Sequence, residues 1–221
     1  MSDRKISTVI FDLDGTLLDT LEDLKNATNY ALKTCGMPER TLEEVRRFVG
    51  NGVKNLMIRA VPDGEDNPQF EHAFDTFKEY YGVHCNDATK AYSGIPELLR
   101  ELKNNGYAMA IVSNKIDSAV QDLKNRYFSQ VEVAIGDREN LRRKPEPDSV
   151  FLALEKLGRS REETVYVGDS DVDLDTARNA GIPCISVLWG FRDKAFLIAH
   201  GAQTFVEKPI EITDVLKRMN Q

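Results

Sequence analysis

The chain has 221 residues, of which 41% are hydrophobic and 29% charged, as in ordinary globular proteins. Its formal net charge of −7 argues against a general nucleic-acid binder, which would need a basic face. No apolar run is long enough to cross a membrane and the first residues carry no signal-peptide pattern, so we expect a cytoplasmic protein that binds neither nucleic acid nor membrane.

The first predicted element is a strand over residues 6–12, a continuous apolar run typical of a strand buried on both faces. From residue 17 to residue 85 the chain shows helical patterns only. Thr41 and Glu44 match a capping box, which predicts the start of one of these helices. A stripe of aromatic residues over 70–81 predicts a last helix packed between the others.

Strands and helices alternate after about residue 90, which implies a parallel, doubly wound sheet with right-handed crossovers. Pro96 opens a helix, and a second helix is predicted over 147–157. The predicted strands lie over 107–113, 131–135, 164–169 and 184–188. We therefore expect an α/β, Rossmann-like core of residues 1–16 and 86–221, into which an all-α helical cap of residues 17–85 is inserted.

Polar residues of the kind used in catalysis collect where the predicted strands end. The carboxyl ends of strands in an open α/β sheet form its ligand-binding edge, so residues distant in sequence converge there. Four strand ends contribute to this group: Asp12 with Asp14, Ser113 with Asn114, Lys144 a few residues after its strand, and Asp169 with Asp173.

Asp12, Asp14 and Asp169 together predict a site for a hard cation. One aspartate after a strand is usually a helix cap or a turn residue. Two carboxylates about 4 Å apart, however, repel by roughly 4 kcal/mol at an effective dielectric constant of about 20. Oxygen ligands without histidine or cysteine favour Mg²⁺. The chain has neither a Walker-type phosphate loop nor a GxGxxG motif after a strand.

Four segments in this order resemble the motifs of the haloacid dehalogenase-like superfamily of phosphotransferases, and the resemblance covers essentially the whole chain. They are "FDLDGT", "IVSN", "RRKPEP" and "VGDSDVD". The resemblance implies that Asp12 is a nucleophile that forms an aspartyl-phosphate, and that Asp14 carries protons to the leaving group and from water. It also implies Mg²⁺ held by Asp12, Asp169 and the backbone carbonyl of Asp14.

The same resemblance assigns the other residues at the strand ends. It makes Asp173 a support of the metal that does not touch it. It assigns phosphate binding to Thr16, Ser113, Asn114 and Lys144. An aspartate at position 14 points to phosphate esters, because dehalogenases and phosphonatases of the superfamily lack it.

The segment "RRFVGNGVKNLMIRA" at 46–60 and the segment "WGFRD" at 189–193 resemble the phosphoglycolate phosphatase branch of this superfamily. This resemblance implies a small phosphate ester, 2-phosphoglycolate, as substrate. We expect a monomer or homodimer. Arg47, Asn51 and Gly52 are the candidates for binding it. Backbone amides at Gly50–Gly52 could bind a carboxylate, or the segment is simply a turn between helices, and both interpretations stay open.

Other functions remain compatible with these motifs. Phosphatases of the same branch that act on pyrophosphate, sugar phosphates or nucleotides share much of the pattern. A mutase of the β-phosphoglucomutase type has the same core and would return the phosphoryl group to a sugar. A two-component receiver domain also phosphorylates an aspartate beside Mg²⁺, although receivers are shorter and have no cap.

Overall fold

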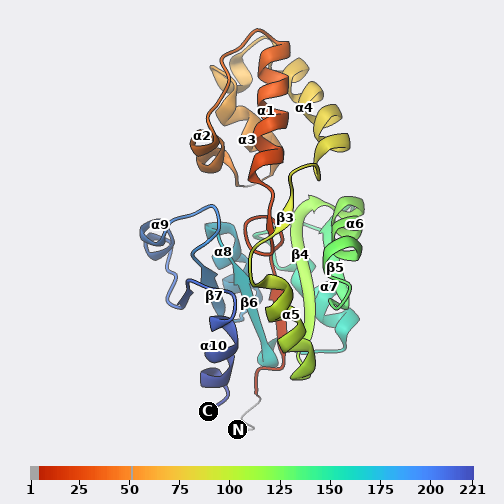
Figure 1. Cartoon of the computed structure of the whole chain (residues 1–221), viewed down its shortest axis with the longest axis vertical. Helices are drawn as coiled ribbons and strands as arrows, with labels where there is room; N and C mark the ends of the chain where they lie inside the picture. Colours follow the sequence, from red (N-terminus) through yellow and green to blue (C-terminus); the bar gives the residue numbers. More distant parts are fainter. Residues whose placement is uncertain (1–4, 51) are drawn as a thin grey trace. The chain divides into compact units, whose positions relative to one another are not determined.

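The computed structural model describes residues 5–50 and 52–221, and the chain divides into two compact units. The α/β unit comprises Met1–Leu17 and Ala91–Gln221, and the helical unit comprises Leu18–Lys90 (Figure 1). Sequence patterns place the second boundary at 85/86, before the observed one. The observed boundary lies between Lys90 and Ala91. Residues 86–90 belong to the helical unit because the Asp23 carboxylate accepts hydrogen bonds from the backbone amides of Ala88 and Thr89.

The α/β unit is built on a parallel sheet that confirms the predicted fold class. Over the described residues it has six strands in the order β5-β4-β1-β6-β7-β8. The central strand β1 is entirely buried, and Phe11 at its end lies opposite Ile111 on one side and Val167 on the other. The strands are β1 (Thr8–Phe11), β4 (Ala108–Ile116), β5 (Val133–Asp137), β6 (Thr164–Gly168), β7 (Cys184–Val187) and β8 (Phe205–Val206).

Helices cover both faces of this sheet (Figure 1). Ile10 and Tyr166 on one face pack against α7 and α8, and on the other face α5 contacts β4 and α10. The helices are α5 (Ile95–Asn104), α6 (Asp117–Tyr127), α7 (Asp148–Leu157), α8 (Asp171–Ala180), α9 (Lys194–Ala199) and α10 (Glu211–Met219), with a 3-10 turn η2 (Arg161–Glu163). Pro147 lies just before α7 rather than in its first turn.

The sequence patterns misplaced or missed several elements of this unit. Strand β4 runs to Ile116, three residues beyond its predicted end, and its pairing with β5 is irregular after Val112. β5 begins at Val133 rather than at residue 131. The edge strand β8 and the helices α9 and α10 follow the last predicted strand and were not predicted.

The helical unit forms its own apolar core. Its helices are α1 (Leu21–Thr34), α2 (Leu42–Phe48), α3 (Val53–Ala60) and α4 (Phe70–His84), with a 3-10 turn η1 (Gly64–Asp66) in the predicted loop. Phe70 and Phe77 of α4 are buried in this core, and the predicted capping box of Thr41 and Glu44 is present at α2. The expectation of helices only over 17–85 was wrong at its start, where β2 (Leu18–Asp19) forms a short strand. It pairs with β3 (Lys90–Ala91), a second short strand that lies beyond this range.

Among the described residues, none of the helices combines the length and the apolar composition that crossing a bilayer requires.

Candidate active site

The site begins where the chain leaves β1. Asp12 is buried, and its amide donates a hydrogen bond to the Val167 carbonyl of β6, so the residue continues the sheet by one step. The chain then turns back at Gly15, whose φ of +91° is in the left-handed region that favours glycine. A Cβ on Gly15 would lie 2.5 Å from Oδ2 of Asp169. Glycine is therefore required both by the turn and by the carboxylate behind it.

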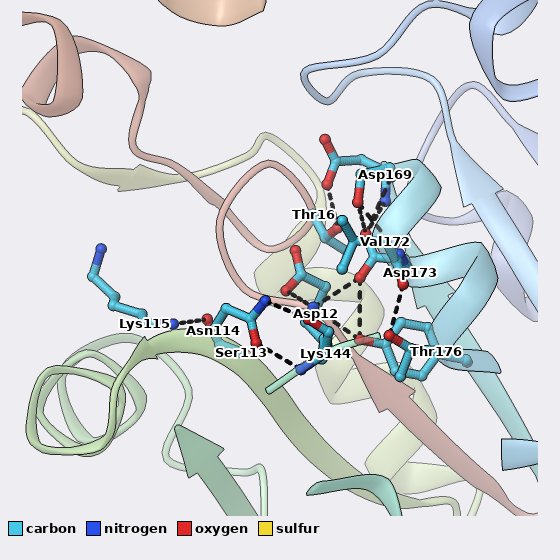
Figure 2. A network of polar contacts seen from close by, with 12 residues as sticks. Asp12, Thr16, Ser113, Asn114, Lys115, Lys144, Asp169, Val172, Asp173 and Thr176 are labelled. Atoms are coloured by element: carbon cyan, nitrogen blue, oxygen red, sulfur yellow. Dashed lines mark hydrogen bonds and ion pairs between the residues drawn. The ribbon is translucent and has the colours of Figure 1, made fainter. Parts of the chain in front are cut away.

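Lys144 joins two carboxylates at the centre of the site (Figure 2). Its buried ammonium donates to Oδ1 of Asp12 at 2.6 Å and to Oδ1 of Asp173 at 2.8 Å. The hydroxyl of Tyr166, fully buried in β6, lies 3.1 Å from the same nitrogen. Asn114 fixes the Lys144 backbone to the end of β4, because its side chain accepts from the Lys144 amide and donates to the Lys144 carbonyl.

Asp169, directly after β6, is held by two other loops. The Thr16 hydroxyl donates to its Oδ1 at 3.2 Å, and the Phe191 amide donates to its Oδ2 at 2.7 Å. The indole nitrogen of Trp189 donates to the Thr16 carbonyl at 3.0 Å, which ties the loop after β7 to the loop after β1. There is no room for a side chain at Gly190, where a Cβ would overlap Asp169 and approach the Gly15 carbonyl to 2.5 Å.

Asp173 lies in the first turn of α8, and both oxygens of its carboxylate accept hydrogen bonds. Its Oδ2 accepts from the backbone amides of Asp169 and Ser170 and from the Ser170 hydroxyl, and the Ser170 side chain caps the helix in return. Its Oδ1 accepts from Lys144 and Tyr166. Both oxygens are thus engaged by the protein itself, which agrees with a supporting role near a metal, although that role stays a prediction.

The electrostatics of the site call for a further positive charge. Burial, together with the charge of Asp173, raises the pKa of Asp169 to about 7 and also raises the pKa of Asp12. Burial alone would lower the pKa of Lys144, but Asp12 and Asp173 keep that pKa well above its ordinary value. One ammonium therefore faces three carboxylates. The pKa values of Asp12 and Asp169 are raised as a result of burial and of this excess of negative charge.

The carboxylate cluster can hold a divalent cation through Asp12 and Asp169, with Asp173 beside them. Among the described residues, Asp12, Asp169 and Asp173 each offer an oxygen within 4.8 Å of the others. Oδ2 of Asp12 accepts no hydrogen bond from the part of the chain that the structure describes, which leaves it available to a cation or a substrate. Oxygen ligands of this kind suit Mg²⁺ or another hard divalent ion. The Asp14 side chain is not in this cluster, and the resemblance assigns only the backbone carbonyl of Asp14 to the metal.

Asp14 and the predicted phosphate ligands lie around this cluster. The Asp14 carboxylate pairs with Lys115 of β4 at 3.2 Å instead of with Lys144. The Ser113 hydroxyl accepts from the Lys115 amide, and Thr16 and Asn114 are engaged by Asp169 and Lys144 as described. The predicted phosphate-binding roles of Ser113, Thr16, Asn114 and Lys144 stay predictions.

The predicted substrate residues of the cap lie in the helical unit. Arg47 of α2 is exposed, and its Nε lies 3.9 Å from Oε1 of Glu43 in an ion pair along the helix. Gly52 precedes α3 with a φ of +87°, whereas Asn51 lies outside the described residues. Arg59 donates to the carbonyls of Phe48 and Gly50, which supports the interpretation of this segment as a turn between α2 and α3. The binding roles of Arg47, Asn51 and Gly52 stay predictions.

Sequence reasoning missed four residues that build the site. Lys115 follows "VSN" directly but was placed outside the predicted strand. Tyr166, Trp189 and Phe191 act through a phenol, an indole and a backbone amide. Tyr166 lies in an apolar strand and Trp189 in a loop, and neither position carries a local sequence signal for such contacts. Only the position of "WGFRD" directly after a predicted strand could have indicated the loop after β7.

Comparisons with known proteins agree with this geometry. The family model described as haloacid dehalogenase-like hydrolase matches residues 9–187. A phosphoglycolate phosphatase of Pseudomonas fluorescens is 33% identical, with 96% of this chain and 77% of the relative covered. An N-acetylmuramic acid 6-phosphate phosphatase of Pseudomonas aeruginosa is 31% identical over 99% and 98%. A candidate phosphoglycolate phosphatase from Lactobacillus delbrueckii subsp. bulgaricus superposes with a TM-score of 0.92, at 34% identity and 96% and 98% coverage.

Proposed function

This chain belongs to the haloacid dehalogenase-like hydrolases and is a phosphoric monoester hydrolase, and we propose that it acts with Mg²⁺ through an aspartyl-phosphate, with 2-phosphoglycolate as its preferred substrate. The observation that carries the proposal is the buried Asp12 carboxylate. One of its oxygens is held by Lys144 at 2.6 Å, and it lies in a group of three carboxylates suited to a divalent ion.

In the proposed first step, an oxygen of Asp12 attacks phosphorus and the bond from phosphorus to the ester oxygen breaks. Asp14 donates its proton to the departing alkoxide, which leaves as an alcohol. In the second step water attacks the phosphorus of the aspartyl-phosphate, Asp14 takes a proton from that water, and the bond from phosphorus to Asp12 breaks. Inorganic phosphate leaves and both aspartates return to their starting state.

Other residues would hold the reacting groups in place during these steps. Lys144 keeps its positive charge beside Asp12 and restrains the carboxylate, while Asn114 anchors the Lys144 backbone. The proposed metal ligands are Asp12, Asp169 and the backbone carbonyl of Asp14. When bound, Mg²⁺ would neutralise the charge that builds up between the carboxylates and the phosphoryl oxygens.

The substrate part of the proposal is supported by what two relatives share. 2-Phosphoglycolate and N-acetylmuramic acid 6-phosphate, the compounds in their names, are very different in size. Both nevertheless combine a phosphate monoester with a carboxylate. The shared chemistry favours a carboxylate-bearing phosphate ester, and the resemblance of residues 46–60 to phosphoglycolate phosphatases favours the smaller of the two.

A substrate panel on metal-depleted protein tests the proposal. We expect no activity after dialysis against EDTA, recovery with Mg²⁺, and poor recovery with Ca²⁺, whose larger and looser coordination disturbs in-line attack. With Mg²⁺, kcat/KM should be highest for 2-phosphoglycolate. N-acetylmuramic acid 6-phosphate and N-acetylglucosamine 6-phosphate form a matched pair with and without the carboxylate. Full activity without metal would overturn the mechanism, and a strong preference for pyrophosphate, a neutral sugar phosphate or a nucleotide would overturn the substrate.

A further inference from the structure

A second cation, Lys115, lies in the α/β unit beside the predicted proton carrier. Its ammonium is 3.2 Å from Oδ1 of Asp14, and its side chain is only 7% exposed, against 23% for Asp14. Lys115 belongs to β4, and its amide donates to the Ser113 hydroxyl. In Figure 2 its side chain points away from the cluster of Asp12, Asp169 and Asp173.

We propose that Lys115 is the specificity residue that binds the carboxylate of the substrate's leaving group. This proposal rests on the proposed function, because it takes Asp14 as the group that protonates the leaving oxygen. Asp14 must then contact that oxygen, and a cation paired with Asp14 lies on the same side of the reacting phosphorus. In 2-phosphoglycolate a single carbon separates the ester oxygen from the carboxylate, so the carboxylate would be presented close to Lys115.

The structure itself shows that one ammonium in this unit can serve two carboxylates. Lys144 donates to Asp12 and Asp173 at the same time and keeps a contact with Tyr166. A lysine ammonium has three donors, so Lys115 can hold Asp14 and a substrate carboxylate in the same way. Lys144 is hydrogen-bonded to Asp12, the proposed nucleophile, whereas Lys115 is paired with Asp14, the proposed proton donor to the leaving group.

Burial gives this interaction its expected strength. A charge-assisted hydrogen bond formed away from water is stronger than one at an exposed lysine, where solvent competes. The alternative role is purely internal: Lys115 would only orient Asp14, and the substrate carboxylate would never contact it. The two roles differ in whether the effect of losing Lys115 depends on a carboxylate in the ligand.

The first experiment compares two esters of similar size. Lys115→Met removes the charge and keeps an unbranched side chain, whereas Lys115→Arg keeps the charge. We expect the ratio of kcat/KM for 2-phosphoglycolate to kcat/KM for ethyl phosphate to fall about 10- to 100-fold in Lys115→Met, and much less in Lys115→Arg. Lys156→Met, on the exposed face of α7, makes the same change in net charge and should leave the ratio unchanged. An equal loss on both esters would overturn the proposal and leave Lys115 as a residue that only orients Asp14.

The second experiment does not depend on which substrate the enzyme prefers. Glycolate, which carries the carboxylate without phosphate, is tested as an inhibitor of p-nitrophenyl phosphate hydrolysis. We expect it to inhibit the wild-type enzyme and the Lys156→Met control, and to lose about 10-fold or more of its potency with Lys115→Met. Absence of inhibition of the wild type, or equal inhibition of Lys115→Met, would overturn the proposal even if 2-phosphoglycolate is the best substrate. If the wild-type enzyme is inhibited but prefers another ester, and Lys115→Met loses the inhibition, only the substrate assignment is overturned. Where Lys115→Met does not fold, inhibition of the wild type alone still tests the proposal.

Discussion

The two units differ in how they compensate the carboxylates that they bury. The helical unit encloses an apolar core, and its buried carboxylate, Asp23, is satisfied by hydrogen bonds from Ala88 and Thr89. The α/β unit encloses three carboxylates around one ammonium at the end of its sheet, with Asp169 raised in pKa to about 7. Buried charge is costly unless it is compensated. Asp23 is thus compensated by hydrogen bonds within the helical unit, whereas the carboxylate cluster carries more negative charge than its one ammonium compensates, as the proposed active site requires.

The largest expected effect tests this distinction with one substitution made in both units. Asp12→Asn removes the nucleophile, so turnover of every ester should fall by about 10⁶-fold, and rapid quench with intact-mass measurement should detect no phosphorylated protein. Asp23→Asn is the matched control. It should keep kcat within a fewfold and cost about 1–3 kcal/mol of unfolding free energy, because it disturbs the hydrogen bonds to Ala88 and Thr89. A phosphorylated Asp12→Asn protein would refute the assignment of the nucleophile.

A smaller effect separates the two aspartates of the first motif. Asp14→Ala should slow the hydrolysis of alkyl phosphates by roughly 10²- to 10⁴-fold, because an alkoxide needs a proton to leave. p-Nitrophenolate leaves without that proton, so the first step should survive better and the phosphoenzyme should accumulate. The expected trace is a burst of about one p-nitrophenolate per enzyme followed by a slow phase. Wild-type rates on alkyl esters in this variant would mean that Asp14 is not the proton carrier.

Next in size is an effect on stability in the helical unit. Phe77 is fully buried in the apolar core, so Phe77→Ala should lower the free energy of unfolding by about 3–5 kcal/mol. Phe151 of α7 is 43% exposed and provides a control. Phe151→Ala should change the free energy of unfolding by less than about 0.5 kcal/mol. Urea unfolding at equilibrium measures both. If the two variants lose equal stability, the core of the helical unit has been misjudged.

The smallest effect concerns a single helix start. Thr41→Ala removes the side chain that accepts the Glu44 amide and donates to its carboxylate, and should cost about 1 kcal/mol. The hydroxyl of Thr34 donates to the Tyr30 carbonyl one turn earlier in α1, so Thr34→Ala at this exposed position should be neutral or slightly stabilising. Differential scanning calorimetry of the two variants compares them directly. A destabilised Thr34→Ala with an unchanged Thr41→Ala would contradict the capping assignment.

The parts of the fold that follow from the sequence are those with long and regular patterns. Apolar runs predicted the five longer strands, β1, β4, β5, β6 and β7, because a strand buried on both faces has little polar surface. Strand β8 has two residues and α9 has six, too few for a periodic signal. The same limit hid β2 and β3. The end of β4 was placed at residue 113 because polar residues follow, yet the strand continues through Lys115 to Ile116.

The predictable part of the site is what depends on strand ends alone. Asp12, Lys144, Asp169 and Asp173 converge because parallel strands deliver their carboxyl ends to one edge. The contacts of Trp189 with Thr16 and of Phe191 with Asp169 join residues more than twenty positions apart through loops. Loop paths of this kind have no periodicity from which they could be predicted, and neither has the pairing of Lys115 with Asp14.

The pairing of β2 with β3 brings the start and the end of the helical unit side by side, and Asp23 fastens the second of these ends to the first helix. An insertion whose two ends meet can be exchanged for another by recombination at two neighbouring points, since the host chain need not be rerouted. Asp12, Asp169 and Asp173 all lie outside the inserted helical unit of Leu18–Lys90. The architecture thus allows a lineage to inherit its reaction chemistry unchanged while it replaces about seventy residues as a block.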